Sequence, residues 1–319
     1  MFEGRSPVKV QLARLEPSIL ARVHFASYKA AAAILRTVGD RGFGRAAWTL
    51  ECIFGSGNAA VFKVFGGRLL RVPLGDGYWM PALIRDRDYE PEVHFVLSKV
   101  LNSRCAFLDC GANIGWWSLF ASTIISSPRR IIAVEASPGL YERLASTAAL
   151  NGDPFICLNR ALWNIGGERL AVLADQRNHA RASVTTLSST AHRAGPTPVE
   201  IQSTTLDELE RDFLDATISE VVVKLDVEGA ELRALEGGQH LLRRDCLIVY
   251  EDHGADPSCH VTREVLQAGF RVFYCDDLFH VQEILNATSL AAFKKDRTRG
   301  YNLFACRPAT AFHHVMLNI

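Results

Sequence analysis

Residues 106–119 contain an acid and two glycines in a pattern that could hold a nucleotide-like cofactor. Asp109 closes an apolar run, Gly111 and Gly115 bracket a turn, and the residues that follow are typical of a helix start. Glycine permits unusual backbone dihedrals and close approach of a ligand, and a helix start offers free N–H groups. The spacing is G-x-x-x-G, not the G-x-G-x-x-G of a dinucleotide fold. We therefore expect a strand, a glycine turn and a helix that contact a cofactor.

A further acid, Glu135, closes the next apolar run at residues 131–134. An acid in this position can accept hydrogen bonds from both hydroxyl groups of a ribose. The alternatives are a purely structural turn for the glycine loop and a solvated or helix-capping acid for Glu135. Because the two features occur in one βαβ unit, we favour the cofactor interpretation.

Acids also end two apolar runs later in the chain. Asp226 ends the run at 221–225 and is followed by Glu228, and the run at 246–250 ends in Glu251-Asp252-His253. Ligands bind at the carboxyl ends of strands in open α/β sheets, so these two groups could face each other across a ligand. The alternatives are a helix cap for Asp226 and a first-turn acid favoured by the helix dipole for Glu228.

Strand-like and helix-like patterns alternate through this part of the chain, which indicates a parallel sheet with crossover helices. The helices include one begun by Ser137 and another, near residue 206, capped by Thr205. The run at 302–306 could insert antiparallel between the run at 270–274 and the fifth strand. The expected strands are 106–108, 131–134, 155–158, 221–226, 246–250, 270–274 and 302–306, and the helix after Asp226 is expected to reach about residue 242.

Residues 1–85 form an expected appendage to this domain, which spans 86–319. A helix from Ile19 to Leu35, opened by Ser18, would have an apolar side. Two apolar runs around Gly66-Gly67 predict a β-hairpin. We expect the appendage to cover the acceptor site or to make a dimer contact, and a packing role for the helix is favoured over a membrane-surface role. The residues on its apolar side are Val23, Ala26, Ala30 and Ala33.

The polar stretch at residues 175–198 has no clear period, so we expect a long loop there. The chain has zero formal net charge and 48% hydrophobic residues, typical of a globular protein with no nucleic-acid footprint. Its eight cysteines are scattered without a C-x-x-C pair, as in a protein of the reducing cytoplasm. No apolar run reaches the ~18 residues of a membrane span, and the start of the chain lacks a secretory apolar region.

Several blocks of the sequence resemble the FkbM-type S-adenosylmethionine-dependent methyltransferases. They occur in the family's order and extend over roughly residues 88–306. The block K-x-D-x-E-G-A-E is the most specific, since it is unusual in generic Rossmann-like enzymes. The blocks are Tyr89-Glu90-Pro91-Glu92, residues 107–115, residues 134–138 and residues 224–231.

The resemblance implies an α/β fold of the Rossmann-like class I methyltransferase type: a seven-stranded, mostly parallel sheet with helices on both faces. It implies that S-adenosylmethionine is the cofactor and that Glu135 binds its ribose. Residues expected along the methionine part are Asp109, Gly111, Asn113 and Gly115. Ala136 and Asp226 are further candidates for cofactor contact, and so is Glu92, for which a first-turn helix acid is the alternative.

The resemblance further implies methyl transfer to a hydroxyl oxygen of a small-molecule or saccharide acceptor. A neutral hydroxyl needs a base within hydrogen-bond reach or a metal that lowers its pKa. The candidate bases are Asp226, Glu228 and His253, although a lone histidine is often only a hydrogen-bonding neighbour. No tight ligand spacing requires a metal, so none is expected.

Two other functions remain as alternatives at this point. A nicotinamide-dependent oxidoreductase is disfavoured by the glycine spacing and by the lack of a Tyr-x-x-x-Lys pair near an acceptor site. A non-catalytic cofactor-binding protein would be expected to lose Asp226 or Glu228, and this chain keeps both.

Overall fold

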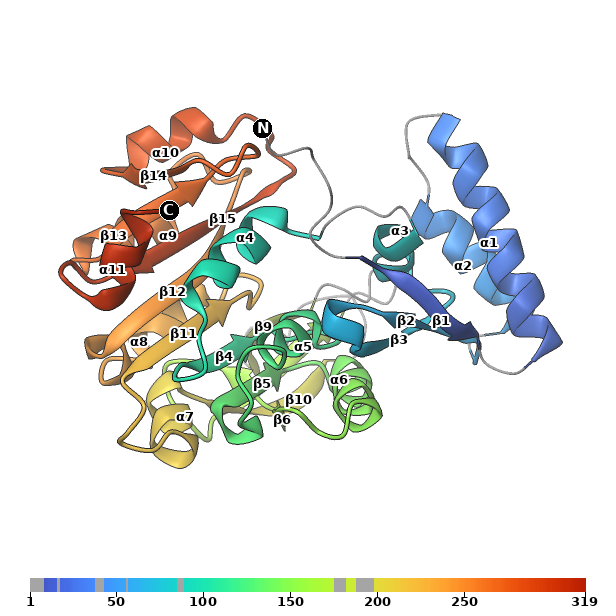
Figure 1. Cartoon of the computed structure of the whole chain (residues 1–319), viewed down its shortest axis with the longest axis horizontal. Coiled ribbons are helices and arrows are strands. Elements are labelled where there is room, and N and C mark those ends of the chain that lie inside the picture. The colour runs from blue at the N-terminus through green and yellow to red at the C-terminus, as the bar shows by residue number, and fades with distance from the viewer. Residues whose placement is uncertain are drawn as a thin grey trace.

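The computed structural model describes residues 9–15, 18–37, 43–55, 57–84, 89–174, 182–187 and 198–319. Within these residues the central sheet has eight strands in the order β14-β13-β15-β12-β11-β4-β5-β6 (Figure 1). The strands are β4 (Ala106–Cys110), β5 (Ile131–Glu135), β6 (Ile156–Asn159), β11 (Glu220–Leu225), β12 (Asp245–His253), β13 (Arg271–Cys275), β14 (Val281–Ile284) and β15 (Gly300–Cys306).

The sheet is mostly parallel, as the sequence predicts. β12, β11, β4, β5 and β6 pair in parallel, and β15 inserts antiparallel between β12 and β13. The expected number of seven strands is wrong by one, because β14 pairs antiparallel with β13 at the edge. This strand is short and half-buried, so its sequence lacks the apolar run that marks the central strands.

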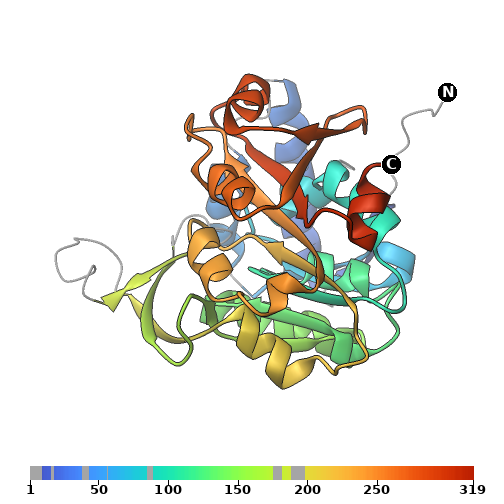
Figure 2. The same ribbon diagram turned by 90° about the vertical axis from the view of Figure 1, so that its left-hand side faces the viewer.

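Successive residues of the central strands belong to two different apolar clusters, one on each face of the sheet. Phe107 packs in one cluster and Leu108 in the other. Figures 1 and 2 show the helices that cover the two faces. One face packs against α4 (Pro91–Val100), α5 (Trp116–Ala121), α6 (Pro138–Leu150) and α11 (Ala311–Met316), and the other against α7 (Leu206–Phe213), α8 (Glu231–Glu236), α9 (His260–Gln267) and α10 (Ala287–Phe293).

Two helices test the sequence predictions directly. α7 begins with the predicted cap: the Thr205 side chain accepts from the Glu208 N–H, and the Glu208 side chain accepts from the Thr205 N–H. α8 ends at Glu236, well before the expected residue 242. The next residue, Gly237, is the C-cap of the helix. A β-carbon on Gly237 would lie 2.4 Å from the Trp163 carbonyl oxygen, so only glycine fits at this helix end.

A smaller sheet lies beside the central one, with the order β7-β10-β8-β9. The expected loop at 175–198 is therefore wrong at residues 182–186, which form a strand antiparallel to β8. Residues 175–181 and 188–197 lie outside the described residues. The strands are β7 (Ala161–Leu162), β8 (Arg169–Ala174), β9 (Ala182–Thr186) and β10 (Val199–Thr204).

The amino-terminal part forms a three-stranded sheet and three helices. The predicted hairpin is confirmed as β2 and β3, and the predicted helix as α1, whose first turn is capped by Ser18. β1 and α2 were not predicted from the sequence. The elements are β1 (Gln11–Leu15), α1 (Ile19–Thr37), α2 (Phe43–Phe54), β2 (Ala59–Lys63), β3 (Leu69–Pro73) and α3 (Trp79–Ile84).

This part shares an apolar core with the central sheet. The ring of Phe65 packs edge-on against Trp116, with centroids 4.7 Å apart, and Leu69 exchanges two backbone hydrogen bonds with the Asn151 side chain. The expected boundary near residue 85 falls on residues 85–88, outside the described residues.

The orientation of α1 differs from the expectation. Its buried residues are Ala21, His24, Tyr28 and Ala32, whereas the expected apolar side, with Val23 at its start, faces solvent. None of the helices that the structure describes is long and apolar enough to cross a membrane.

Candidate active site

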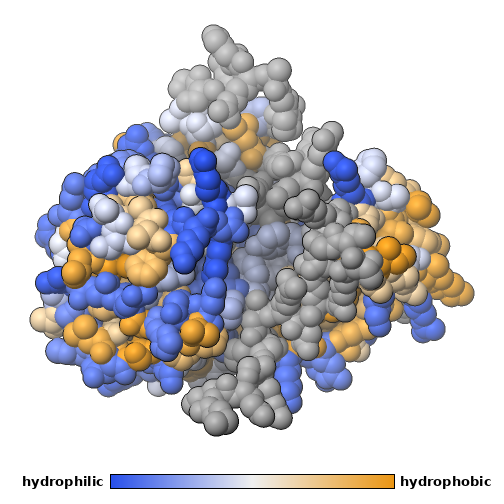
Figure 3. All heavy atoms as spheres, turned by 90° about the horizontal axis from the view of Figure 1, so that it is seen from above, coloured by the Kyte–Doolittle hydropathy of each residue, from blue (hydrophilic) through white to orange (hydrophobic). Residues whose placement is uncertain are grey.

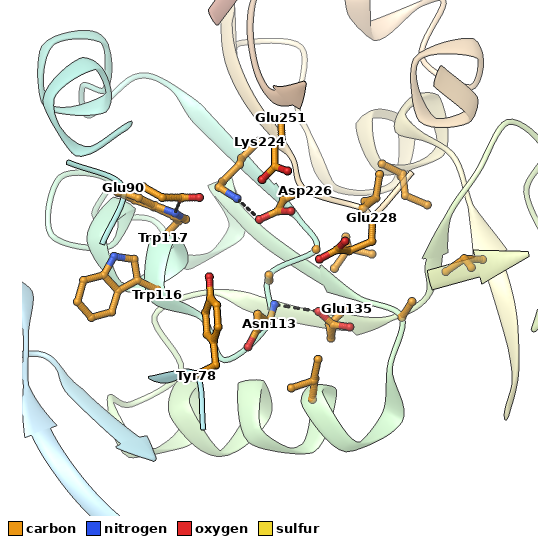
Figure 4. Close-up of a pocket in the computed structure, with 18 of the residues that line it drawn as sticks. Tyr78, Glu90, Asn113, Trp116, Trp117, Glu135, Lys224, Asp226, Glu228 and Glu251 are labelled. Atoms are coloured by element: carbon orange, nitrogen blue, oxygen red, sulfur yellow. Dashed lines mark hydrogen bonds and ion pairs between the residues drawn. The ribbon is translucent and has the colours of Figure 1, made fainter. Parts of the chain in front are cut away.

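A pocket opens at the carboxyl ends of β4, β5, β11 and β12 (Figure 4). It has two sides, which we name after their central charged residues. The Glu135 side contains Asn113, Glu135 and the apolar residues Ala136 and Leu140. The Lys224 side contains Glu90, Lys224, Asp226 and Glu251, together with aromatic residues that include Tyr78, Tyr89 and Trp117.

The two sides meet at Gly111, the first residue of the turn after β4. Its N–H donates to the Val134 carbonyl at 2.9 Å, and the N–H of Asp226 donates to the Cys110 carbonyl at 2.9 Å. Gly111 has φ +81°, and a β-carbon there would lie 1.8 Å from the Asp226 carbonyl oxygen. Only glycine allows this turn to fit between β5 and the end of β11.

Glu135 is held by backbone N–H groups. One carboxylate oxygen accepts from the Asn113 N–H at 2.9 Å (Figure 4), and the other accepts from the Ser137 N–H at 2.9 Å. Burial raises the pKa of the Glu135 carboxyl to about 7, although both hydrogen bonds oppose that shift. Each oxygen keeps one lone-pair direction for a ligand. The side chain is therefore fixed in position and still able to accept hydrogen bonds from a diol.

The amino-terminal part contributes to the pocket through residues 76–79. The Trp79 indole N–H donates to the Asn113 side-chain oxygen at 3.0 Å. Asp76 accepts from the N–H groups of Tyr78 and Trp79, and forms an ion pair with Arg143 of α6 at 3.0 Å. These contacts fix Tyr78 and Trp79 at the pocket.

On the other side, one buried lysine is surrounded by carboxylates. The Lys224 ammonium pairs with Asp226 at 2.8 Å, and the lysine side chain is only 4% exposed. Burial lowers the pKa of Lys224, but the carboxylates of Asp226, Glu90 and Asp109 outweigh burial and hold that pKa above its usual value. Lys224 therefore stays charged and offsets part of the negative charge around it.

The positive charge of Lys224 does not fully neutralise the negative charges of two further carboxylates, Glu90 and Glu251. Burial raises the pKa of Glu90 to about 7, with Lys224 opposing the shift. Burial also raises the pKa of Glu251 to about 7, and the charges of Asp226 and Glu90 add to the effect. Among the described residues, no group donates a hydrogen bond to the Glu251 carboxylate. Both side chains therefore change protonation state near neutral pH.

Aromatic side chains orient Glu90. The Trp117 indole N–H donates to the Glu90 carboxylate at 2.9 Å, and the Tyr78 and Tyr89 hydroxyls lie 3.1 Å apart. Burial raises the pKa of both tyrosines above the usual value, so both hydroxyls stay protonated. Glu90 itself has φ +47°, a left-handed conformation shared at this pocket by Asn113 and Glu228. Strained backbone of this kind is concentrated at functional sites.

Six residues predicted from the sequence line the pocket: Gly111, Asn113, Glu135, Ala136, Asp226 and Glu228. The structure does not place Asp109 or Gly115 in its lining. Asp109 is buried beneath the turn and accepts from the Ser118 hydroxyl at 2.6 Å. At Gly115, a β-carbon would lie 2.9 Å from a Leu144 methyl group, so this glycine allows α5 and α6 to pack closely.

Glu92 and His253 also lie outside the pocket lining. The Glu92 carboxylate accepts from the Asn302 amide at 2.9 Å, which ties α4 to β15. The His253 ring accepts from the Ala255 N–H at 3.0 Å.

Sequence reasoning did not single out Tyr78, Glu90, Lys224 or Glu251, although it expected the group that contains Glu251 to face Asp226 across a ligand. Signals existed for three of them, since Glu90 and Lys224 lie in blocks of the family resemblance and Glu251 ends an apolar run beside His253. Nothing in the sequence distinguished Tyr78. The described residues contain no group of three or more histidine, cysteine or acidic side chains placed to hold a metal ion.

The pocket residues fit S-adenosylmethionine, the cofactor that the resemblance implies. Glu135 can accept from the two ribose hydroxyls, and Ala136, Leu140 and Leu162 offer apolar surface to the adenine. The excess of carboxylates around Lys224 suits the positively charged sulfonium.

A protein-family model agrees with this cofactor. The model of the FkbM methyltransferase domain matches residues 109–272. No curated protein matches the sequence. Similar solved structures include a precorrin-6y C5,15-methyltransferase from Geobacter metallireducens, with 12% identity over 68% of this chain and 87% of that chain (TM-score 0.38). They also include an FkbM methyltransferase from Methylobacillus flagellatus, with 14% identity over 73% of this chain and 54% of that chain (TM-score 0.38).

A third similar structure is a putative methyltransferase from Streptococcus mutans, solved in complex with S-adenosylhomocysteine. It shares 11% identity over 69% of this chain and 98% of that chain, with a TM-score of 0.36. The matched domain model spans half of the chain and includes the turn with Gly111, Glu135 and the Lys224–Asp226 pair. The chain therefore belongs to the FkbM family of S-adenosylmethionine-dependent methyltransferases.

Proposed function

We propose that the protein methylates a hydroxyl oxygen of a small-molecule or saccharide acceptor, with Glu251 as the general base. The observation that carries this proposal is the position of the Glu251 carboxylate at the end of β12, beside the Lys224–Asp226 pair (Figure 4). Its raised pKa of about 7 lets it accept a proton at neutral pH.

The reaction divides between the two sides of the pocket. When bound, S-adenosylmethionine supplies a methyl carbon activated by its attachment to a sulfonium. Glu135 and the turn at Gly111 hold the cofactor, and the aromatic residues of the Lys224 side exclude water. Glu251 would accept the proton that the acceptor hydroxyl loses when its oxygen takes the methyl group and the carbon–sulfur bond breaks to leave S-adenosylhomocysteine.

Glu251 suits this role better than the bases predicted from the sequence. The Asp226 carboxylate is already engaged in an ion pair with Lys224 at 2.8 Å. His253 lies outside the pocket lining, and its ring nitrogen accepts from a backbone N–H. Glu228 adds negative charge that raises the pKa of Glu251. We therefore assign Asp226 and Glu228 to electrostatics and Glu251 to proton transfer.

The acceptor enters on the side to which the amino-terminal part contributes. Tyr78 and Trp79 line the pocket, so the proposal includes these two residues of the amino-terminal part in the acceptor site. An acidic site with few cations repels polyanions, which disfavours nucleic acid as the acceptor.

The test compares two neighbouring substitutions, with transfer of labelled methyl to a panel of polyols, saccharides and amines. Glu251→Gln should lower kcat by about 10²–10⁴-fold while S-adenosylhomocysteine affinity changes less than about twofold. His253→Gln is the matched control and should retain activity. An unchanged rate for Glu251→Gln would overturn the base assignment, and label found only on amines would overturn the proposed oxygen acceptor.

A further inference from the structure

Helix α1 presents an apolar stripe to solvent. Ile19, Val23 and Ile34 are 82%, 45% and 67% exposed, and Ala26 and Ala30 between them are also exposed. These five residues, which we call the outer stripe, repeat at the spacing of one helix face. The opposite face is buried separately, so packing within this chain does not explain the outer stripe.

The neighbouring helix adds exposed apolar residues. α1 and α2 lie side by side, joined by a stack of His24 on Phe54 with ring centroids 5.1 Å apart (Figure 1). Trp48 and Ile53 of α2 are 64% and 66% exposed. Figure 3 shows apolar atoms gathered at the end of the molecule that these two helices form. Apolar surface of this extent marks an interaction site.

Among the described side chains of the two helices, the exposed charges are all basic. Arg22 and Lys29 of α1 and Arg45 of α2 are exposed, and α1 contains no aspartate or glutamate. The acid of α2 is Glu51, which is half-buried. Its carboxylate packs against Gly75 so closely that a β-carbon on Gly75 would lie 2.4 Å from it. The exposed charges of this surface are therefore basic.

We propose that the α1–α2 surface docks the protein on an anionic lipid bilayer. An amphipathic helix with basic residues beside an apolar face lies in the plane of the interface, and exposed tryptophan favours the headgroup level. A symmetric dimer through the same surface would place basic residues opposite basic residues, and the described part of the surface has no exposed acid to pair with them. An anionic membrane supplies the missing charge.

This surface lies on elements that contribute no residue to the pocket lining, so the proposal is independent of the proposed acceptor and base. Trp48 and the outer stripe can therefore be changed without altering the catalytic residues. Preserved S-adenosylhomocysteine binding and helix content then serve as controls for folding.

The experiment is co-sedimentation of the full chain with vesicles of phosphatidylcholine alone or with about 30% phosphatidylserine. We expect at least about tenfold stronger binding to the anionic vesicles, weakened by high salt. The double variant Ile19→Gln/Ile34→Gln should lose about tenfold of this binding, and Arg22→Gln/Lys29→Gln should lose the preference for phosphatidylserine. Leu278→Gln/Leu285→Gln, at leucines that are 74% and 70% exposed elsewhere, is the matched control and should bind as the unmodified chain does.

Equal sedimentation with both kinds of vesicle, or with neither, would overturn the proposal. So would a dimer, detected by light scattering without lipid, that Ile19→Gln/Ile34→Gln dissociates, because the surface would then be a contact between copies.

Discussion

The two sides of the pocket stabilise negative charge by different means. Glu135 is held by two backbone N–H groups from the turns that flank it. On the Lys224 side, Glu90, Asp226 and Glu251 share a single buried lysine, and burial leaves Glu90 and Glu251 with a pKa of about 7. Burial raises the pKa of Glu135 to about 7 as well, so the two sides differ in what holds the carboxylates: two backbone N–H groups fix Glu135, whereas Glu90 and Glu251 share the charge of one lysine with Asp226.

This difference matches the two tasks of a methyltransferase. Recognition of the neutral ribose requires fixed hydrogen-bond acceptors, which backbone donors orient best. Binding a cationic sulfonium and accepting a proton require carboxylates whose protonation state can change when the ligand binds. The following predictions test this division, beginning with the residue at which both sides meet.

Gly111→Ala should produce the largest effect, because its β-carbon would lie 1.8 Å from the Asp226 carbonyl at φ +81°. We expect S-adenosylhomocysteine binding to fall below calorimetric detection and the free energy of unfolding to fall by about 3 kcal/mol. Gly139→Ala is the control, since a β-carbon there meets nothing within 4 Å. Normal binding by Gly111→Ala would show that the two sides are not coupled through this turn.

Glu135→Ala should weaken ligand binding at the Glu135 side and leave the Lys224 side unchanged. Loss of hydrogen bonds to a charged acceptor corresponds to about 1.5–3 kcal/mol, or about 10–100-fold weaker S-adenosylhomocysteine binding. The rate at saturating S-adenosylmethionine should change much less. Glu142→Ala, on the exposed face of α6, is the control for removing an acid near this site. A change of less than twofold in affinity would remove the ribose role from Glu135.

The charge of the Lys224 side should distinguish S-adenosylmethionine from S-adenosylhomocysteine, which lacks the sulfonium charge. As the pH rises from 6 to 8, Glu90 and Glu251 ionise through their pKa of about 7. Glu135, whose pKa is also about 7, ionises over the same range and affects both ligands alike. The affinity for S-adenosylmethionine should therefore increase by up to about tenfold more than the affinity for S-adenosylhomocysteine. Calorimetric titrations at several pH values measure both profiles, and parallel profiles would contradict this assignment.

Glu90→Gln should give the smallest effect, on stability. The pKa of Glu90 is raised from 4.5 to about 7 in the folded chain, so its ionisation opposes folding as the pH rises from 4.5 to 7. At pH 8 the ligand-free variant should be more stable by on the order of 1 kcal/mol, and this gain should disappear near pH 5. Urea unfolding at both pH values tests this, and a variant less stable at pH 8 would show that Glu90 stabilises the fold through Lys224.

How much of the site could be predicted depends on the distance along the chain between its parts. Gly111, Asn113 and Glu135 belong to one βαβ unit, so strand ends and glycine spacing were enough to place them in one pocket. Lys224 and Glu251 lie near the ends of β11 and β12, which the sheet order makes neighbours, and Glu90 reaches them from the start of α4. Tyr78 reaches the pocket from outside the sheet, and no periodic pattern in the sequence predicts its position there.

The same distinction explains the errors in the fold. The central strands are continuous apolar runs because both of their faces are buried, and such runs can be read directly. β9 and β14 are edge strands with exposed or half-buried side chains, so their sequences resemble loops. α1 has two apolar stripes, and its sequence does not specify which stripe the rest of the chain covers.

The sequence by itself determined the alternation of strands and helices, the glycine turn after β4 and the acid at the end of β5, because each depends on residues close together in the chain. The tertiary structure alone decided which carboxylates share Lys224, which of them has no hydrogen-bond donor among the described residues, and which face of α1 meets solvent. Charge interactions and burial depend on distance in space, and the residues concerned are joined only when the sheet is assembled.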